Sequence, residues 1–266
     1  MIALIPMAGE GSRFQQEGYT TPKPLLDVLG KPMVIQAAAS LPVADQYIFI
    51  CRAFHIAQYQ IDQALRQYYP EAAIITVDAL TEGQASTCLL AKDLINNDKA
   101  LMIGASDNGM QYDRERFEEA TKDADCLVFT FRNNVTVVPK PQQYGWVAVD
   151  EDLMATKVSV KVPISTDPIH DHAVVGAFWF RQGSLFVEAA ERMIQKNRRV
   201  NNEFYVDECI NEVIEAGSKV KVFEIDQYVC WGTPNDLRTF MYWESFFRQE
   251  SFHPYGGPSP VAAVEG

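Results

Sequence analysis

The amino-terminal segment of the chain places a glycine-rich turn directly after a buried strand. Residues 1–6 form the apolar run MIALIP, and Gly9 and Gly11 follow within five residues. Glycines leave backbone N–H groups uncovered, and a turn of this kind at the carboxyl end of a strand binds phosphate in many α/β proteins. The segment therefore favours an α/β fold whose ligand lies at one edge of a parallel sheet.

Two cations follow this glycine turn. Arg13 comes two residues after Gly11, and Lys23 is held between two prolines. The turn is not a P-loop, because no Gly-Lys-Ser/Thr follows, and it lacks the third glycine of a dinucleotide-binding fingerprint. The glycines alone are equally compatible with an ordinary strand-to-helix turn. The added arginine and Pro-Lys-Pro favour binding of a nucleoside triphosphate.

Taken together, residues 7–33 resemble the signature of the sugar-1-phosphate nucleotidyltransferases, the nucleotide-diphospho-sugar pyrophosphorylases. That signature reads Gly-x-Gly-Ser/Thr-Arg, then Pro-Lys-Pro and Gly-Lys-Pro-Met, and the resemblance covers roughly residues 1–247. It implies transfer of a nucleoside monophosphate from a triphosphate to a sugar 1-phosphate, with release of pyrophosphate, for activated-sugar or surface-polysaccharide biosynthesis. It also implies that Arg13 and Lys23 are catalytic and that the phosphate loop contains Met7, Ala8, Gly9, Gly11 and Ser12.

Apolar segments alternate with segments of helical period through the first half of the chain. The predicted strands are Gln46–Cys51, Ala72–Val77, Lys99–Ala105 and Cys126–Arg132, and the predicted helices are Ala53–Tyr69, Ala85–Ile95 and Asp113–Lys122. We therefore expect an α/β fold with a Rossmann-like, mixed but mostly parallel sheet and helices on both faces.

The second half begins with strands that have no long helices between them. These are Tyr144–Val149, Lys157–Val162 and Val174–Phe180, followed by predicted helices 183–197, 206–216 and 234–247 and a strand at 219–225. We expect a small antiparallel insertion over the acceptor pocket, within about residues 138–182 and 198–217 of a single domain, 1–250. Residues 251–266 are rich in Pro and Gly and are expected to form a C-terminal tail.

Asp107 follows a predicted strand at the expected ligand edge, next to Ser106. A carboxylate there can hold Mg²⁺, which binds oxygen ligands and bridges phosphates, or it can simply cap a turn. In the resembling family an Asp at the end of this strand is a metal ligand, which implies Mg²⁺ as cofactor and a nucleotide contact from Ser106.

A second predicted nucleotide contact opens the helix after residue 83. Glu82 and Gly83 lie in a segment similar to the family's Gly-x-Ala loop, which reads the base. Asp78 stands where uridylyl- and thymidylyltransferases carry Gln. Because ionised Asp only accepts hydrogen bonds, it favours CTP or GTP. A solvent-facing Asp at the end of a strand is the alternative.

The acceptor motifs match the family less well. Gly145 lies in a segment similar to the family's Tyr-Gly-Val strand. Glu203 stands near the position where the family has an acidic residue that reaches the acceptor, which implies the same role for Glu203. The family usually has Glu-Lys-Pro where this chain has Val-Lys-Val-Pro at 160–163, so the usual sugar-binding glutamate is missing. We expect Lys161 to supply the cation for the acceptor phosphate, and a solvent-facing strand lysine is the alternative. This departure leaves open a cytidylyltransferase that acts on a non-sugar phosphorylated alcohol or amide.

The second metal position also departs from the family. The motif Asp-x-Gly-Thr-Pro reads Cys230-Trp-Gly-Thr-Pro here, and a thiol is a poor Mg²⁺ ligand. We expect Asp226, or else Asp236, to replace it, unless Asp107 holds the metal with phosphates and water. The same departure motivates a catalytically silent nucleotide-binding module as an alternative.

A glycosyltransferase of related fold is a further alternative. Such enzymes hold a nucleotide sugar through an Asp-x-Asp pair, and the sequence has this spacing at 123–125 and at 150–152. Both pairs fall in predicted turns, where solvated aspartates are common.

Composition limits the partners. The 266-residue chain has a net charge of −12 and no run of more than two Lys/Arg, which disfavours nucleic acid and anionic membranes. No uncharged apolar run is long enough to span a membrane. Five cysteines without a Cys-x-x-Cys pair read as reduced thiols of a cytoplasmic protein. The expected partners are a nucleoside triphosphate and a phosphorylated acceptor, and the long closing helix is compatible with a homo-oligomer.

Overall fold

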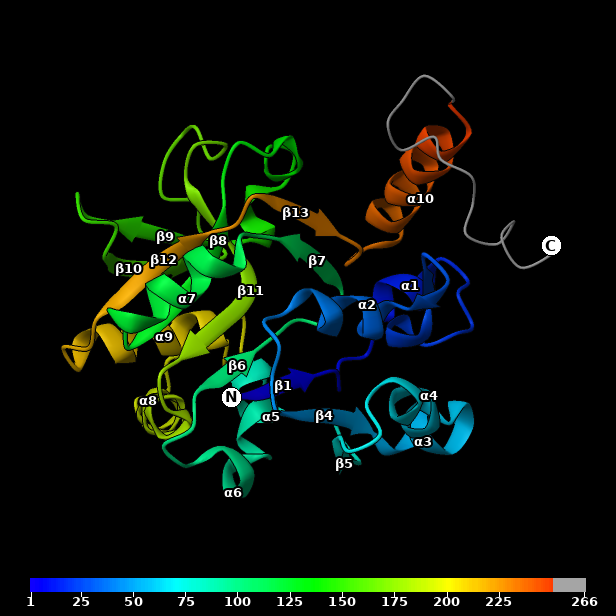
Figure 1. Ribbon diagram of the computed structural model, residues 1–266, viewed down its shortest axis with the longest axis horizontal. Coiled ribbons are helices and arrows are strands. Elements are labelled where there is room, and N and C mark those ends of the chain that lie inside the picture. The colour runs from blue at the N-terminus through cyan, green and yellow to red at the C-terminus, as the bar shows by residue number, and fades with distance from the viewer. Residues whose placement is uncertain (251–266) are drawn as a thin grey trace.

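A nine-stranded mixed sheet runs through the computed structural model, which describes residues 1–250 (Figure 1). The strands follow the order β10-β9-β11-β6-β1-β4-β5, and β8 joins β11 to β12. Their bounds are β1 (Ile2–Pro6), β4 (Gln46–Arg52), β5 (Ala73–Val77), β6 (Leu101–Ile103), β8 (Cys126–Phe131), β9 (Gly145–Val149), β10 (Ala155–Val160), β11 (His172–Phe180) and β12 (Val220–Glu224).

The sheet is parallel through β6, β1, β4 and β5 and again between β8 and β12. Strand β1 pairs in parallel with β4 and β6, β4 pairs in parallel with β5, and β12 does so with β8. Strand β11 runs antiparallel to β6, β8 and β9, and β9 runs antiparallel to β10. The predicted α/β class and mixed sheet are confirmed. The antiparallel strands continue the central sheet, so the expected insertion shares its hydrophobic core.

Helices cover both faces of the sheet, and the alternating side chains of β1 show which helices cover each face. Ile2 and Leu4 point into a core with α5 (Gln84–Leu89), α6 (Lys92–Ile95), α8 (Gly183–Gln195) and α9 (Val206–Glu215). Ala3 and Ile5 point into the opposite core, with α2 (Met33–Ser40), α4 (Ile61–Tyr68) and α7 (Arg114–Lys122). A strand buried on both faces reads as a continuous apolar run, as residues 1–6 do.

A third, smaller core joins the two ends of the described chain beside the glycine turn. It packs α1 (Ser12–Gln16) and the start of α2 against Trp231 and the first turns of α10 (Pro234–Gln249). Figure 1 shows α1, α2 and α10 at the same end of the molecule. Phe14 and Trp231 lie at its centre. The short helix η1 (Lys23–Leu25) and the hairpin β2 (Asp27–Val28)–β3 (Lys31–Pro32) complete this region.

Two predicted helices are broken in the structure. The first divides into α3 (Ala53–Tyr59) and α4 at Gln60, which has a left-handed φ of 52°. The second divides into α5 and α6, where Leu90 and Ala91 donate to the carbonyls three residues earlier instead of four. Neither break contains Gly or Pro, so composition gave no sign of them.

A two-stranded sheet was also not predicted. Strands β7 (Asn108–Gln111) and β13 (Gln227–Cys230) pair antiparallel, with Cys230 opposite Asn108. The short helices η2 (Val135–Val137) and η3 (Pro141–Gln143) lie between β8 and β9.

All five cysteines are free, and every one except Cys230 is buried. None of the helices within residues 1–250 is long and apolar enough to cross a membrane. The predicted tail, 251–266, lies outside the described residues, and the single-domain boundary stays a prediction.

Candidate active site

The carboxyl ends of four parallel strands border one cavity of about 480 Å³. Strand β1 leads into the glycine turn, and β6 leads into Ser106 and Asp107. Strands β4 and β5 flank β1 on its other side and lead toward His55 and Leu80. The predicted loop residues Met7, Ala8, Gly9, Gly11 and Ser12 all line this cavity, together with Arg13, Lys23, Gly83, Ser106, Asp107 and Glu203.

The glycine turn adopts the backbone conformation that its sequence suggested. Gly11 has a φ of 65°, the left-handed region that disfavours a side chain. A Cβ on Gly11 would come within 3.4 Å of Lys23 Cβ, while a Cβ on Gly9 would meet nothing within 4 Å. Gly9 therefore leaves backbone open to the cavity, and Gly11 lets Lys23 lie against the turn.

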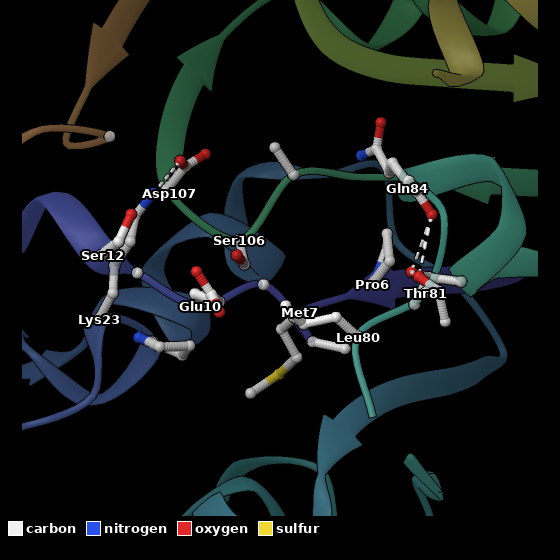
Figure 2. A pocket seen from close by; sticks show the side chains of 18 of the residues that line it. Pro6, Met7, Glu10, Ser12, Lys23, Leu80, Thr81, Gln84, Ser106 and Asp107 are labelled. Atoms are coloured by element: carbon white, nitrogen blue, oxygen red, sulfur yellow. Dashed lines mark hydrogen bonds and ion pairs between the residues drawn. The ribbon is translucent and has the colours of Figure 1, made fainter. Parts of the chain in front are cut away.

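Lys23 and Asp107 form an ion pair across 84 residues of sequence (Figure 2). Their side chains are 16% and 28% exposed. Burial alone would raise the pKa of Asp107, but the charge and hydrogen bond of Lys23, with a contribution from Arg13, lower it below the ordinary value. The carboxylate is therefore ionised at neutral pH, paired with Lys23 and stabilised further by the charge of Arg13.

The loop that carries Asp107 is tied to the segment after β13. Trp231 N donates a 2.9 Å hydrogen bond to Asp107 O. A Cβ on Gly232 would lie 3.1 Å from Asp107 Oδ2, so this glycine gives the carboxylate its space. The Gly-Thr-Pro motif thus reaches the site even though its preceding Asp is replaced by Cys230.

The acidic residues near Cys230 differ from the expectation. Asp226 is exposed, forms a 2.8 Å ion pair with Arg116, and lines neither this cavity nor the smaller one that adjoins it. It lies just before β13, opposite the Gln111 end of β7, so a strand length separates it from Asp107. The structure does not bring Asp226 to the site. The alternative, Asp236, lies beside Cys230, whose Sγ is 3.5 Å from Asp236 Oδ2.

The donor chemistry near Asp107 fits a hard cation only in part. Burial, with the charges of Asp107 and Asp236, raises the pKa of Cys230 to about 12, so its thiol is neutral. No three His, Cys, Asp or Glu side chains among residues 1–250 are grouped closely enough to hold a metal ion by themselves. Mg²⁺ commonly keeps waters and uses one or two carboxylates with substrate phosphates. Asp107 fits that mode, and Asp236 joins it in the lining of a smaller, adjoining cavity.

The far end of the cavity is formed by the segment before α5. Figure 2 shows Lys23 and Asp107 on one side and Thr81 and Gln84 on the other, with Met7 and Ser106 between them. Gly83 caps α5 with a φ of 121°, and a Cβ there would lie 2.5 Å from Phe204 N. Phe204 N donates to Glu82 O, and Ala85 N donates to Phe204 O. Gly83 is thus required by a close backbone approach.

Two predicted base contacts point elsewhere. Asp78 is exposed and does not line the cavity, where Leu80 and Thr81 stand instead. Glu82 is also exposed and forms a 3.1 Å ion pair with Arg199. The basis for favouring CTP or GTP therefore has no support in the geometry.

His55 was not singled out from the sequence but lines this cavity. It is 5% exposed, and its Nδ1 has no hydrogen-bond partner in the protein. Burial, with the nearby charge of Arg52, lowers the pKa of His55, which favours the neutral ring. One histidine near a strand end carries no distinguishing sequence signal.

A second cavity of about 280 Å³ adjoins the first. The two share Arg13, Gln84, Ala105, Asp107 and Gly232. The second cavity also contains the predicted acceptor residues Gly145 and Lys161, whereas Glu203 lines the first. The structure therefore brings the predicted phosphate-binding and acceptor-binding residues together around Arg13 and Asp107.

Lys161 occupies a strained position. Its φ of 62° is unusual for a residue with a side chain, and such strain is common at functional sites. Its Nζ donates to Gln143 O and lies 5.6 Å from the ring centre of Tyr205. Burial lowers the pKa of Lys161, although the negative charge of Asp207 opposes this.

Asp207 was also missed, because an Asp in the first turn of a helix reads as a helix-dipole partner. It lines the second cavity from α9. A Cβ on Gly145 would lie 2.2 Å from Asp207 Oδ2, so the carboxylate rests directly on the Gly145 backbone. Burial raises the pKa of Asp207 to about 6, although Lys161 opposes the shift.

Comparisons with known proteins agree with this architecture. The family model for nucleotidyl transferases matches residues 2–244, and the chain belongs to that family. A search of curated proteins found no match. The fold is similar to that of a nucleoside-diphosphate-sugar pyrophosphorylase from Vibrio cholerae RC9 (TM-score 0.74, 20% identity, covering 91% of this chain and 100% of that one).

Two further structures share the fold. One is the inositol-1-phosphate CTP transferase from T. maritima, with a TM-score of 0.70 and 13% identity, covering 94% of this chain and 96% of that one. The other is a Bacillus anthracis protein assigned as a glucose-1-phosphate thymidylyltransferase and solved with a sucrose, with a TM-score of 0.71 and 18% identity, covering 97% and 100%. At these identities the likeness concerns the fold.

Proposed function

We propose that the protein transfers a nucleoside monophosphate from a nucleoside triphosphate to a sugar 1-phosphate and releases pyrophosphate. The observation that carries this proposal is the pair of adjoining cavities that meet at Arg13 and Asp107. Two anionic substrates held on either side of this junction would meet where the cations lie. The product, an activated sugar, would serve polysaccharide biosynthesis, and the demand for a nucleoside triphosphate suits a cytoplasmic enzyme.

The chemistry requires no nucleophile from the protein. An oxygen of the acceptor phosphate attacks the α-phosphorus in line, the bond from that phosphorus to the β-phosphate oxygen breaks, and pyrophosphate leaves with its electron pair. Catalysis then consists of positioning the substrates and stabilising charge. Arg13 would bind the leaving β- and γ-phosphates, and Lys23 would bind near the α-phosphate. The backbone at Gly9 would receive phosphate oxygens.

Asp107, with Asp236 nearby, would hold Mg²⁺ together with phosphate oxygens. When bound, this ion would neutralise phosphate charge. The neutral Cys230 thiol would take no part, because Mg²⁺ prefers oxygen ligands. On the acceptor side, Lys161 would bind the phosphate, with Gly145 and Glu203 bordering the rest of the acceptor.

The Asp-x-Asp pairs give no support to a glycosyltransferase. Asp123 is paired with Lys219 and Lys221, and the Asp150 carboxylate accepts hydrogen bonds within its own turn. Neither pair lines the two cavities. The arrangement of Arg13, Lys23 and Asp107 likewise supports a catalytic protein over a silent nucleotide-binding module.

The test is a matrix of five nucleoside triphosphates against phosphorylated acceptors, with pyrophosphate release as the readout. Acceptors should include sugar 1-phosphates, inositol 1-phosphate and a simple phosphorylated alcohol, because the T. maritima neighbour is a CTP transferase for inositol 1-phosphate. We expect release with at least one sugar 1-phosphate. Release only with the phosphorylated alcohol would favour the cytidylyltransferase alternative, and tight nucleotide binding without release from any pair would contradict the proposal.

A further inference from the structure

We propose that Asp207 is the residue that recognises hydroxyl groups of the acceptor sugar. This inference rests on the proposed function and adds a specificity-determining residue to it. Asp207 projects from the first turn of α9 into the second cavity, which Lys161 and Gly145 also line.

The carboxylate is fixed in place by its neighbours. Gly145 leaves no side chain between β9 and α9, and Asp207 Oδ2 occupies the space that a Cβ there would need. Lys161 lies close enough for its charge to oppose the rise in the pKa of Asp207. Its Nζ, however, donates its hydrogen bond to Gln143 O. Within residues 1–250 no other side chain donates a hydrogen bond to the Asp207 carboxylate. The backbone N–H of Asp207 itself bonds the carboxylate, and the remaining acceptor capacity is available to a ligand.

A carboxylate of this kind selects a ligand that donates hydrogen bonds. Hydroxyl and amino groups both qualify, but Lys161 and Arg13 line the same cavity and disfavour a cationic amine. Both cations instead favour the phosphate of the acceptor. Asp207 is then free to accept hydrogen bonds from hydroxyl groups on the same molecule.

The other walls of the cavity favour the same class of ligand. Tyr144, Tyr205 and Tyr228 line it, and Tyr205 lies close enough to Asp207 for the carboxylate to contribute to the raised pKa of its phenol. Tyr228 is held by stacking on Phe131 at 4.1 Å between ring centres. Ring faces with a nearby hydrogen-bond acceptor suit the mixed apolar and hydroxylated surface of a sugar or cyclitol better than a short aliphatic chain.

The experiment compares Asp207→Asn with wild type by pyrophosphate release, with KM measured separately for nucleotide and acceptor. The probes are glucose 1-phosphate, myo-inositol 1-phosphate and phosphoethanolamine. The best hydroxylated acceptor is then compared with deoxy analogues that lack single hydroxyls. The matched control is Glu208→Gln, one residue along α9, because Glu208 bonds Asn211 and lines neither of the two cavities.

Asn keeps one carbonyl oxygen as a hydrogen-bond acceptor, so Asp207→Asn loses only the difference between a charged hydrogen bond, about 1.5–3 kcal/mol, and a neutral one, about 0.5–1.5 kcal/mol. We therefore expect the acceptor KM to rise by about 5- to 10-fold. The nucleotide KM should stay the same. For one deoxy analogue, the variant and the wild type should have the same acceptor KM. An unchanged acceptor KM in Asp207→Asn, an equal rise in both KM values, or a preference for phosphoethanolamine would overturn the role of Asp207. Absence of release by wild type with every acceptor would instead overturn the proposed function and this inference with it.

Discussion

Single residues in the site are arranged so that cations meet where the two cavities join. Arg13 lines both cavities, and Lys23 reaches the same junction through its ion pair with Asp107. Removing a group that acts mainly in the transition state costs about 10²–10³ in rate. We therefore expect Arg13→Ala and Lys23→Ala each to lower kcat by about that factor in a pyrophosphate-release assay.

The matched control for these variants is Lys92→Ala. Lys92 also forms an ion pair, with Glu191, but both side chains are at least 40% exposed and lie away from the cavities. Exposed pairs contribute little to stability, so this variant should behave as wild type. Near-normal turnover by both Arg13→Ala and Lys23→Ala would contradict the assigned roles.

Asp207 also predicts a pH-dependent stability. Its pKa is raised from 3.8 to about 6 by burial, so the folded protein binds more protons than the unfolded chain between these values. Stability contributed at this position is therefore lost as pH rises from about 4 to about 6, which is the reverse of a salt-bridged Asp. We expect Asp207→Asn to raise the thermal midpoint at pH 7.5 and to leave it nearly unchanged near pH 4. A variant less stable than wild type at pH 7.5 would contradict this.

At the scale of elements, Gly83 joins α5 to the segment before α9 by direct backbone contact. Ala at this position would combine the cost of a left-handed conformation with a clash against Phe204 N, at 2.5 Å. We expect Gly83→Ala to reduce the free energy of unfolding in urea by about 2–4 kcal/mol. Gly18 separates the two causes, because its φ is 84° but a Cβ would meet nothing within 4 Å. Gly18→Ala should cost about 1–2 kcal/mol, and equal losses would exclude the contact at Phe204 as a cause.

At the break between α3 and α4, a substitution is expected to increase the free energy of unfolding. Gln60 adopts a φ of 52° and belongs to neither helix. A left-handed residue with a side chain costs about 1–2 kcal/mol relative to glycine, part of which is offset by the entropy that glycine loses on folding. Gln60→Gly should therefore raise the free energy of unfolding by up to about 1 kcal/mol in urea denaturation. Destabilisation would show that Gln60 is not strained.

Elements were predictable where a local pattern alone determines them. The apolar run of β1 and the helical period of α8 and α9 follow from burial on both faces of a strand and on one face of a helix. The β7–β13 pair depends on a contact between residues 108 and 230, and no local pattern encodes such a pairing. The breaks at Gln60 and at Leu90–Ala91 follow from packing rather than from a helix-breaking residue.

At the scale of the whole molecule, the site was predictable where its residues lie in one segment. The glycine turn and Lys23 are close in sequence, so a motif could identify them. Asp78 was predicted to contact the base from its position in the chain relative to the family's motif. The structure instead brings Leu80 and Thr81 to the cavity. His55 and Asp207 acquire their positions only when β4 and α9 pack, because neither belongs to a recognisable motif.

The two backbone hydrogen bonds of Phe204 have a consequence for the thermodynamics of binding. They fasten the loop at Gly83, on the proposed nucleotide side, to the residues just before Asp207, on the proposed acceptor side. A ligand that orders one loop also orders the other, so the second ligand causes a smaller loss of conformational entropy when it binds. We expect positive cooperativity between the substrates, with the acceptor bound several-fold more tightly when a non-hydrolysable triphosphate is present. Because linkage is reciprocal, the acceptor should tighten the triphosphate by the same factor in calorimetric titrations, and independent binding would contradict the coupling.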